Sequence, residues 1–185
     1  MHTLPLQDII RSQFPGLTRK LGDKTVVFFD GPAGSQVPQS VADAVSHYML
    51  HTNANGGGFF ATSLESDALM EEAQVAAAGF FGASDPHEVI FGPNMTSLTL
   101  KLSRALKTQW QPGDEIILSS SEHDANFTPW VKAAESKGVV IKTIPLKQEN
   151  CTLDQEAYLE LLGPKTKLVA VGLASNATGT IHAIT

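Results

Sequence analysis

The chain has 185 residues, of which 42% are hydrophobic and 17% are charged. This length suits one ordinary domain, or one domain with an appendage, and the hydrophobic content excludes a wholly disordered chain. The charged fraction lies below the roughly 25% of an average soluble protein, which predicts that much of the surface is covered by something else. The net charge is −6, and residues 1–93 carry four Lys and Arg against ten Asp and Glu. Because no basic stripe is present, we expect no nucleic-acid partner.

The single cysteine, Cys151, excludes a disulfide framework and a zinc ribbon, each of which needs several thiols. No apolar run approaches the roughly 20 residues that span a bilayer, so we expect no membrane segment. Residues 1–11 lack the basic start and apolar stretch of a secretory signal. These features predict a cytoplasmic protein.

The first third of the chain reads as a series of short elements. In order, we expect an arm or short helix in residues 1–25, an apolar run at 26–29, a turn-rich stretch at 30–34, a helix from about Pro38, and a loop with three glycines at 51–63. A long helix is predicted over 65–81. One side of it is apolar, formed by Leu64, Ala68, Leu69, Ala73, Ala76 and Phe80.

From residue 88 onward, strand-like and helical patterns alternate. We predict strands at 88–91, 115–119, 139–145 and 168–173, with helices at about 95–107, 126–137 and 154–162. This alternation is typical of parallel βαβ units whose sheet is covered by helices. Ligands of such sheets bind beyond the carboxyl ends of the strands, so the loops after each strand are the candidate sites.

The first such loop, residues 92–96, opens a helix. Free backbone N–H groups at a helix start favour an anion, but the spacing alone favours Asn94 or Thr96 serving simply as a helix N-cap. The loop is not a P-loop, because the Gly-Lys-Ser/Thr ending is missing.

The two later loops each present one notable polar side chain. His123, in the loop at 120–126, has the chemistry of a base, a metal ligand, a flat stacking surface or a plain surface residue. No second histidine at ligand spacing supports zinc. Asn176, in the loop at 174–180, is able to donate to a phenolate or carboxylate, or to form an Asx-type turn helped by Gly179.

Taken together and in order, these motifs resemble the class V aminotransferase and cysteine desulfurase family, whose members are pyridoxal-phosphate (PLP) enzymes of fold type I. The resemblance runs from about Val26 to the end of the chain. Its most specific parts are Glu122-His123-x-Ala125-Asn126-x-x-Pro129-Trp130 and Ser175-Asn176-x-x-Gly179-Thr180. It implies an α/β fold with a mixed, mostly parallel sheet covered by helices.

The resemblance assigns roles in binding PLP. His123 matches the histidine that stacks on the pyridine ring, and Asn176 matches the asparagine near the ring's phenolic oxygen. The segment Asn94, Met95, Thr96 matches the turn that holds the phosphate, although this chain reads Gly-Pro-Asn-Met-Thr where the family usually has Gly-Thr-Thr-Glu.

The resemblance also implies a small amino-acid substrate and a homodimer whose sites are completed across the two-fold interface. Pro32 and Ala33 match the loop on the substrate side, and Asn176 lies near the substrate carboxylate. Desulfurases usually carry His-Arg-Gly before the long helix, whereas residues 53–59 here contain no basic side chain, and the second histidine of the common Glu-His-His motif is Asp124. The chain alone does not separate desulfurase from aminotransferase, lyase or epimerase.

In the family, the lysine that forms the Schiff base with PLP and the carboxylate at the pyridine nitrogen both lie beyond the Ser-Asn-x-x-Gly motif. Neither is matched here, so we expect no catalytic residue in this chain and little or no activity from it alone. Residues 1–63 would form an N-terminal arm, strand-helix and Gly-rich loop, and residues 64–185 the first part of the PLP-binding large domain. The sheet would be incomplete, with open strand edges.

Two other hypotheses remain open at this stage. The chain is either a non-catalytic module or half-enzyme that another polypeptide completes, or an unrelated α/β phosphate-binding enzyme with His123 as a base.

Overall fold

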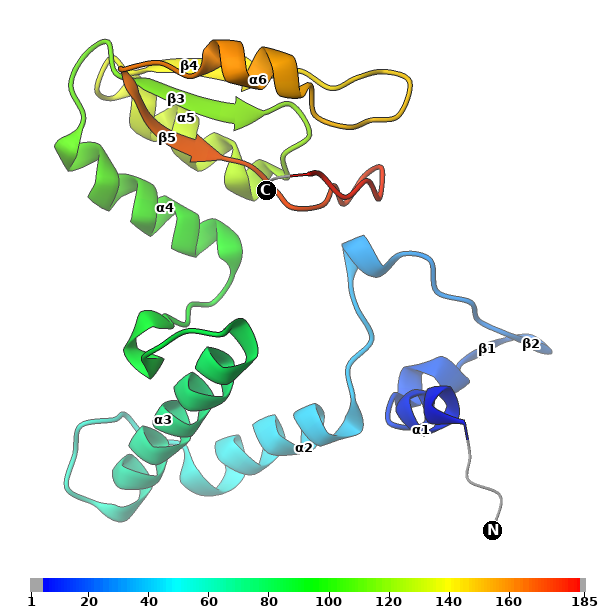
Figure 1. Cartoon of the computed structure of the whole chain (residues 1–185). Helices are drawn as coiled ribbons and strands as arrows, with labels where there is room; N and C mark the ends of the chain where they lie inside the picture. The colour runs from blue at the N-terminus through cyan, green and yellow to red at the C-terminus, as the bar shows by residue number, and fades with distance from the viewer. Residues whose placement is uncertain (1–4, 184–185) are drawn as a thin grey trace. The chain divides into compact units, whose positions relative to one another are not determined.

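A computed structural model describes residues 5–183 of the chain. It divides the chain into two compact units, residues 1–90 and 91–185, and each is described here by itself (Figure 1). The sequence-based division after residue 63 concerns which part of the family fold each segment supplies, and it stays a prediction.

The first unit consists of short elements followed by one long helix. They are α1 (Leu6–Ser12), η1 (Pro15–Thr18), β1 (Lys20–Leu21), β2 (Lys24–Thr25), η2 (Gly31–Ala33), α2 (Gln39–His47), the π-helical turn η3 (Tyr48–Thr52), α3 (Ala61–Phe81) and η4 (Pro86–Glu88). The predicted short N-terminal helix is confirmed as α1, and Pro38 directly precedes α2 as expected. β1 and β2 pair as a small antiparallel hairpin.

The long helix α3 begins at Ala61, four positions before the predicted start at residue 65. The Ser63 side chain explains the difference. Its Oγ donates to the Asn55 carbonyl and accepts from the Gly58 N–H, both at 2.7 Å, so the glycine loop is fastened to the first turn of the helix. The helix ends at Gly82, whose φ of 73° is the left-handed C-terminal conformation that glycine favours.

The apolar side predicted for α3 is not buried within this unit. Phe80 is 83% exposed and Leu64 and Leu69 are about half exposed, whereas the buried positions are Ser63, Ser66 and Ala78. The reason is that, among the described elements of the first unit, η3 and η4 are the ones that pack closely along this helix.

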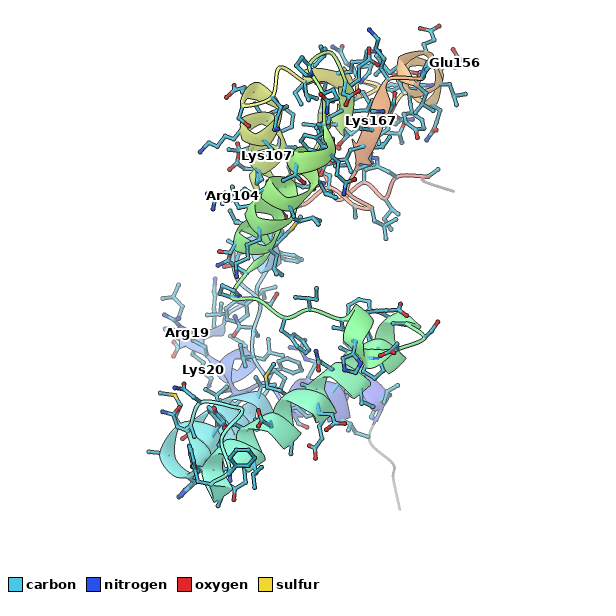
Figure 2. The ribbon with its side chains drawn as sticks, turned by 90° about the vertical axis from the view of Figure 1, so that its left-hand side faces the viewer. Arg19, Lys20, Arg104, Lys107, Glu156 and Lys167 are labelled. Carbon is cyan, nitrogen blue, oxygen red and sulfur yellow. The ribbon has the colours of Figure 1, made fainter. Side chains whose placement is uncertain are left out.

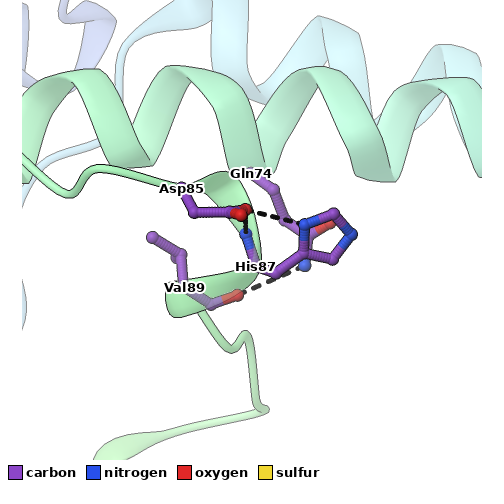
Figure 3. A network of polar contacts seen from close by, with 4 residues as sticks. All are labelled: Gln74, Asp85, His87 and Val89. Carbon is purple, nitrogen blue, oxygen red and sulfur yellow. Dashed lines mark hydrogen bonds and ion pairs between the residues drawn. The ribbon is translucent and has the colours of Figure 1, made fainter.

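The predicted strand at 88–91 does not form. Residues 86–88 instead make the η4 turn, in which the Asp85 carboxylate accepts from the His87 backbone N–H at 2.8 Å and lies 2.7 Å from His87 Nδ1. These two contacts hold the pKa of Asp85 below its usual range. Gln74 of α3 donates to the Val89 carbonyl at 3.2 Å (Figure 3). This segment is apolar enough for a strand, but no strand in the described part of the chain pairs with it.

The second unit confirms the predicted alternation of helices and strands. Its elements are α4 (Met95–Leu106), η5 (Lys107–Gln109), β3 (Glu115–Ser119), η6 (Asp124–Asn126), α5 (Thr128–Glu135), β4 (Val140–Ile144), α6 (Gln155–Leu161) and β5 (Thr166–Ala170). β3 has its predicted bounds. β5 ends at Ala170 rather than at residue 173, because the Gly172 N–H donates to a side chain, that of Glu122, instead of to a neighbouring strand.

The three strands of this unit form a parallel sheet in the order β4-β3-β5. The central strand β3 is buried on both faces, which explains its continuous apolar run. Ile116 and Leu118 face a core shared with α5 and the end of α4, and Ile117 faces a second core with α6. Successive residues of a strand point to opposite faces, so one strand contributes to both cores. The unit is therefore a three-layer sandwich, with α6 on one face of the sheet and α5 on the other (Figure 1).

Charged side chains surround the amino ends of the strands. Lys142 Nζ lies 2.6 Å from Glu115 and Lys167 Nζ lies 3.7 Å from Asp114. Figure 2 labels Lys167 on β5, with Arg104 and Lys107 at the end of α4, where positive charge is favourable to the helix dipole. Lys167 lies near the start of β5, whereas Lys142 lies in the middle of β4 and reaches the Glu115 carboxylate at the start of β3, at the edge opposite to the candidate loops.

In the part of the chain that the structure describes, no helix combines the length and the apolar character needed to cross a membrane.

We predict that Ile117→Ala destabilises the second unit by about 2–5 kcal/mol, because it removes a fully buried side chain between β3 and α6. Leu159→Ala, at a position on α6 that is 66% exposed, is the control and is expected to cost less than about 1 kcal/mol. Urea unfolding followed by the fluorescence of Trp110 and Trp130, which both lie in the α5-side core, measures the difference. Equal effects of the two changes would contradict the assigned core.

Candidate functional site

The candidate site lies at the carboxyl edge of the second unit's sheet, where two loops meet. We call Ser120–Asn126, which follows β3, the β3 loop, and Ala174–Ile181, which follows β5, the β5 hairpin. The β5 hairpin closes through a bridge between Ala174 and Ile181. Two hydrogen bonds tie the β3 loop to the β5 side of the sheet: Glu122 accepts from the Gly172 N–H, and Ser121 Oγ bonds to His182 Nε2.

Glu122 is the main fastening between the two strand ends. Its Oε1 accepts from Ser119 Oγ and from the Gly172 backbone N–H, both at 2.6 Å, and its Oε2 accepts from Asn126 Nδ2 at 2.7 Å. Asn126 Oδ1 in turn accepts from Trp130 Nε1 at 3.0 Å. The most specific motif of the sequence is therefore a polar network that shapes the β3 loop, and Glu122 and Asn126 are occupied within it.

His123 is exposed in the middle of the β3 loop. Its Nδ1 accepts from the Ala125 backbone N–H at 3.1 Å and caps η6. Because Nδ1 is an acceptor here, the neutral ring carries its proton on Nε2. The backbone contact orients the imidazole while its flat faces stay accessible, which suits a stacking surface.

Asn94 is the N-cap of α4, which is one of the two roles that the sequence predicted for it. Its Oδ1 accepts from the Ser97 N–H at 2.9 Å. The N–H groups of Met95 and Thr96 lie in the first turn, where no intrahelical acceptor exists, and both residues are exposed. The helix start thus offers two backbone donors to an anion, next to the Thr96 hydroxyl. α4 packs against η6, the short helix within the β3 loop.

Asn176 lies exposed at the tip of the β5 hairpin. The turn is made by its neighbour, because Ser175 Oγ accepts from the N–H groups of Ala177 and Thr178, each at 3.3 Å. Gly179, with a φ of 71°, completes the turn. Ser175 therefore forms an ST-type turn in place of the Asx-type turn proposed for Asn176, and the Asn176 amide makes no hydrogen bond within residues 5–183.

Sequence reasoning missed the contact between Ser121 and His182. His182 Nε2 lies 3.0 Å from Ser121 Oγ, and His182 is only 4% exposed. The two residues are separated by 61 positions, and no sequence pattern marks them as partners. His182 follows the β5 hairpin directly, so this contact is a second fastening between the two loops.

The structure gathers the predicted cofactor residues in the second unit, together with Asn176, which is also a predicted substrate residue, and leaves Pro32 and Ala33 in the first. Asn94, Met95, Thr96, His123 and Asn176 all belong to residues 91–185. Pro32 and Ala33 form the η2 turn of the first unit, where both are exposed.

Residues 27–185 match the family model described as aminotransferase class-V, and the chain therefore belongs to this family. The hypothesis of an unrelated phosphate-binding α/β enzyme is accordingly wrong.

Curated relatives agree with this assignment. A probable cysteine desulfurase of Mycolicibacterium paratuberculosis is 36% identical over 93% of this chain and 25% of its own length. A probable cysteine desulfurase of Vibrio cholerae is 35% identical, covering 94% of this chain and 43% of that protein. The aminotransferase-like protein FGM3 of Gibberella zeae is 37% identical, over 95% and 43% respectively.

Solved structures show the same fold. A cysteine desulfurase from Thermococcus onnurineus matches with a TM-score of 0.85 and 28% identity, over all of this chain and 44% of its own. A cysteine desulfurase from Escherichia coli matches with a TM-score of 0.80 and 28% identity, over 98% and 45%. The chain thus spans less than half the length of these relatives, and the fold-type I assignment made from the sequence is confirmed.

We predict that Glu122→Ala costs roughly 2–4 kcal/mol of stability, because it leaves three donors without their acceptor in a half-buried position. The matched control is Asp124→Ala, which removes an exposed carboxylate two positions along the same loop and is expected to cost less than about 1 kcal/mol. Urea unfolding measures both. A Glu122→Ala effect no larger than that of the control would show that the network does not hold the two strand ends.

Proposed function

We propose that this chain supplies the phosphate-binding and ring-binding loops of a PLP-dependent enzyme that acts on an amino acid. The observation that carries the proposal is the joining of the β3 loop and the β5 hairpin at one edge of the sheet, with α4 packed against η6 of the β3 loop. Family membership supports it, because the motifs that form these loops are those by which the chain resembles PLP enzymes.

The residues present fit PLP by the chemistry of their donors. The backbone N–H groups of Met95 and Thr96 suit a phosphate, which favours the positive end of a helix dipole. The exposed ring of His123 offers an apolar face for a pyridine, and Asn176 has an uncommitted amide that donates to a phenolic oxygen or a carboxylate.

When bound, PLP acts as an electron sink that stabilises negative charge at the substrate carbon bearing the amino group. The side chains of this chain orient the reactants. His123 would stack on the ring, and its own orientation is fixed by the hydrogen bond at Nδ1. Asn94 accepts from the Ser97 N–H at the start of α4 and leaves the N–H groups of Met95 and Thr96 for the phosphate. Asn176 would orient the substrate carboxylate, and Pro32 and Ala33 match the family's substrate-side loop by resemblance.

We propose that the lysine for the Schiff base comes from residues outside 1–185. Lys165 precedes β5, and Lys142 and Lys167 pair with carboxylates at the amino ends of the strands, away from the candidate loops. Relatives more than twice as long as this chain have room for such a lysine. By the same reasoning, residues 64–185 form the first part of the PLP-binding domain and residues 1–63 an N-terminal arm.

The names of the relatives favour cysteine as the substrate, whereas residues 53–59 lack the basic side chains that the resemblance leads us to expect in a desulfurase. In this chain the Gly57 N–H is bound by the Asp67 carboxylate at 2.9 and 3.1 Å, so the segment folds onto α3. We therefore propose that the substrate is an amino acid whose side chain is unassigned. The proposal also includes a homodimer and a cytoplasmic location.

We predict that His123→Ala weakens the binding of PLP by up to about tenfold, because an aromatic stacking contact contributes about 0.5–1.5 kcal/mol. His123→Phe keeps the flat surface and is expected to stay within about threefold of the unmodified protein. The measurement is the PLP dissociation constant of the apoprotein, with His87→Ala as the control at an exposed histidine of the first unit.

The three variants separate the possible roles of His123. When the change is made in the enzyme as its cells produce it, loss of activity in His123→Phe with unchanged PLP affinity would indicate proton transfer instead of stacking. Undetectable binding of PLP to the unmodified protein would contradict the proposed function altogether.

A further inference from the structure

A chain of hydrogen bonds runs from the carboxylate of Glu122 to the buried ring of His182. Glu122 Oε1 accepts from Ser119 Oγ at 2.6 Å, Ser119 Oγ lies 3.3 Å from Ser121 Oγ, and Ser121 Oγ lies 3.0 Å from His182 Nε2. Ser119 is fully buried and His182 is 4% exposed. Ser119 ends β3, Ser121 and Glu122 belong to the β3 loop, and His182 follows the β5 hairpin.

The carboxylate at one end sets the direction of every bond. An ionised carboxylate only accepts, so the one hydroxyl proton of Ser119 is committed to Glu122. Ser119 Oγ is then the acceptor for the Ser121 hydroxyl, and Ser121 Oγ is the acceptor for His182. The ring of His182 must therefore carry its proton on Nε2.

This tautomer leaves Nδ1 of His182 as a buried acceptor, and Nδ1 has no hydrogen-bond partner among the described residues. A buried polar atom without a partner lowers the free energy of unfolding, so the position of the His182 ring is unfavourable for stability. Ser121 and His182 are no catalytic pair for acyl transfer, because that chemistry needs a group that orients the other ring nitrogen.

We propose that His182 is a positioning residue that holds the β3 loop, and with it His123, in the orientation that accepts the PLP ring. The inference rests on the proposed function. Ser121 and His123 are two positions apart in one short loop, and Glu122 between them is fixed to Gly172. His182 adds a second fixed point at Ser121, before Glu122 in the sequence, whereas Asn126 binds Glu122 from a position after His123. The backbone that carries His123 is therefore held on both sides.

The test compares His182→Leu with His182→Gln in the protein as its cells produce it. Gln keeps a donor that reaches Ser121, whereas Leu removes it. The control is His87→Gln, the same change at an exposed histidine of the first unit. The probes are 4′-deoxypyridoxine 5′-phosphate, which lacks the aldehyde and binds without a lysine, and inorganic phosphate.

We expect His182→Leu to weaken the deoxypyridoxine phosphate complex about tenfold and to leave the affinity for inorganic phosphate within about twofold, since the phosphate binds at the start of α4. His182→Gln should restore most of the affinity. Equal weakening for both probes would show a general loss of structure and overturn the positioning role, as would no change for either.

Hydrogen exchange separates this inference from the proposed function. His182→Leu should speed the exchange of amides in residues 120–126, and His182→Gln and His87→Gln should not. Unchanged exchange would overturn the inference whether or not the protein binds PLP. If the unmodified protein binds no deoxypyridoxine phosphate but exchange rises in His182→Leu, the proposed function fails and the fastening by His182 stands.

Discussion

The half-buried carboxylate of Glu122 holds the carboxyl edge of this sheet together. A charge in such a place is tolerated when donors surround it, and here the donors come from the end of β3, from the turn after β5 and from η6. Satisfying them ends β5 at Ala170 and fixes the β3 loop. The exposure of His123 and the order of the hydrogen bonds that lead to His182 both follow from this contact.

Much of this arrangement was predictable from the sequence where local pattern decides the structure. The run Ile116–Leu118 is buried on both faces, so its continuous apolar character marked β3 correctly. Pattern failed at residues 88–91, because an apolar run becomes a strand only when a neighbour pairs with it. It also failed at the start of α3, which a side-chain contact of Ser63 extends, and at His182, whose partner lies 61 positions away. Long-range contacts of single side chains leave no periodic signal.

Family membership and geometry support each other at different levels. Membership rests on residues 27–185 and on relatives that this chain covers for less than half their length. The geometry adds which motif residues are free for a ligand. Glu122 and Asn126 are committed to the network, whereas His123 and Asn176 are exposed and the first turn of α4 keeps unpaired donors. The motif therefore contains two kinds of residue: those that hold the loop in place and those that face a ligand.

The most direct test of the account is a crystal structure of the protein with 4′-deoxypyridoxine 5′-phosphate, which reports binding by these loops without help from a lysine. The account predicts the phosphate at the N–H groups of Met95 and Thr96 and the ring against His123, with Glu122 still bound to Gly172. A ligand bound elsewhere, or a β3 loop rearranged so that Glu122 releases Gly172, would contradict it.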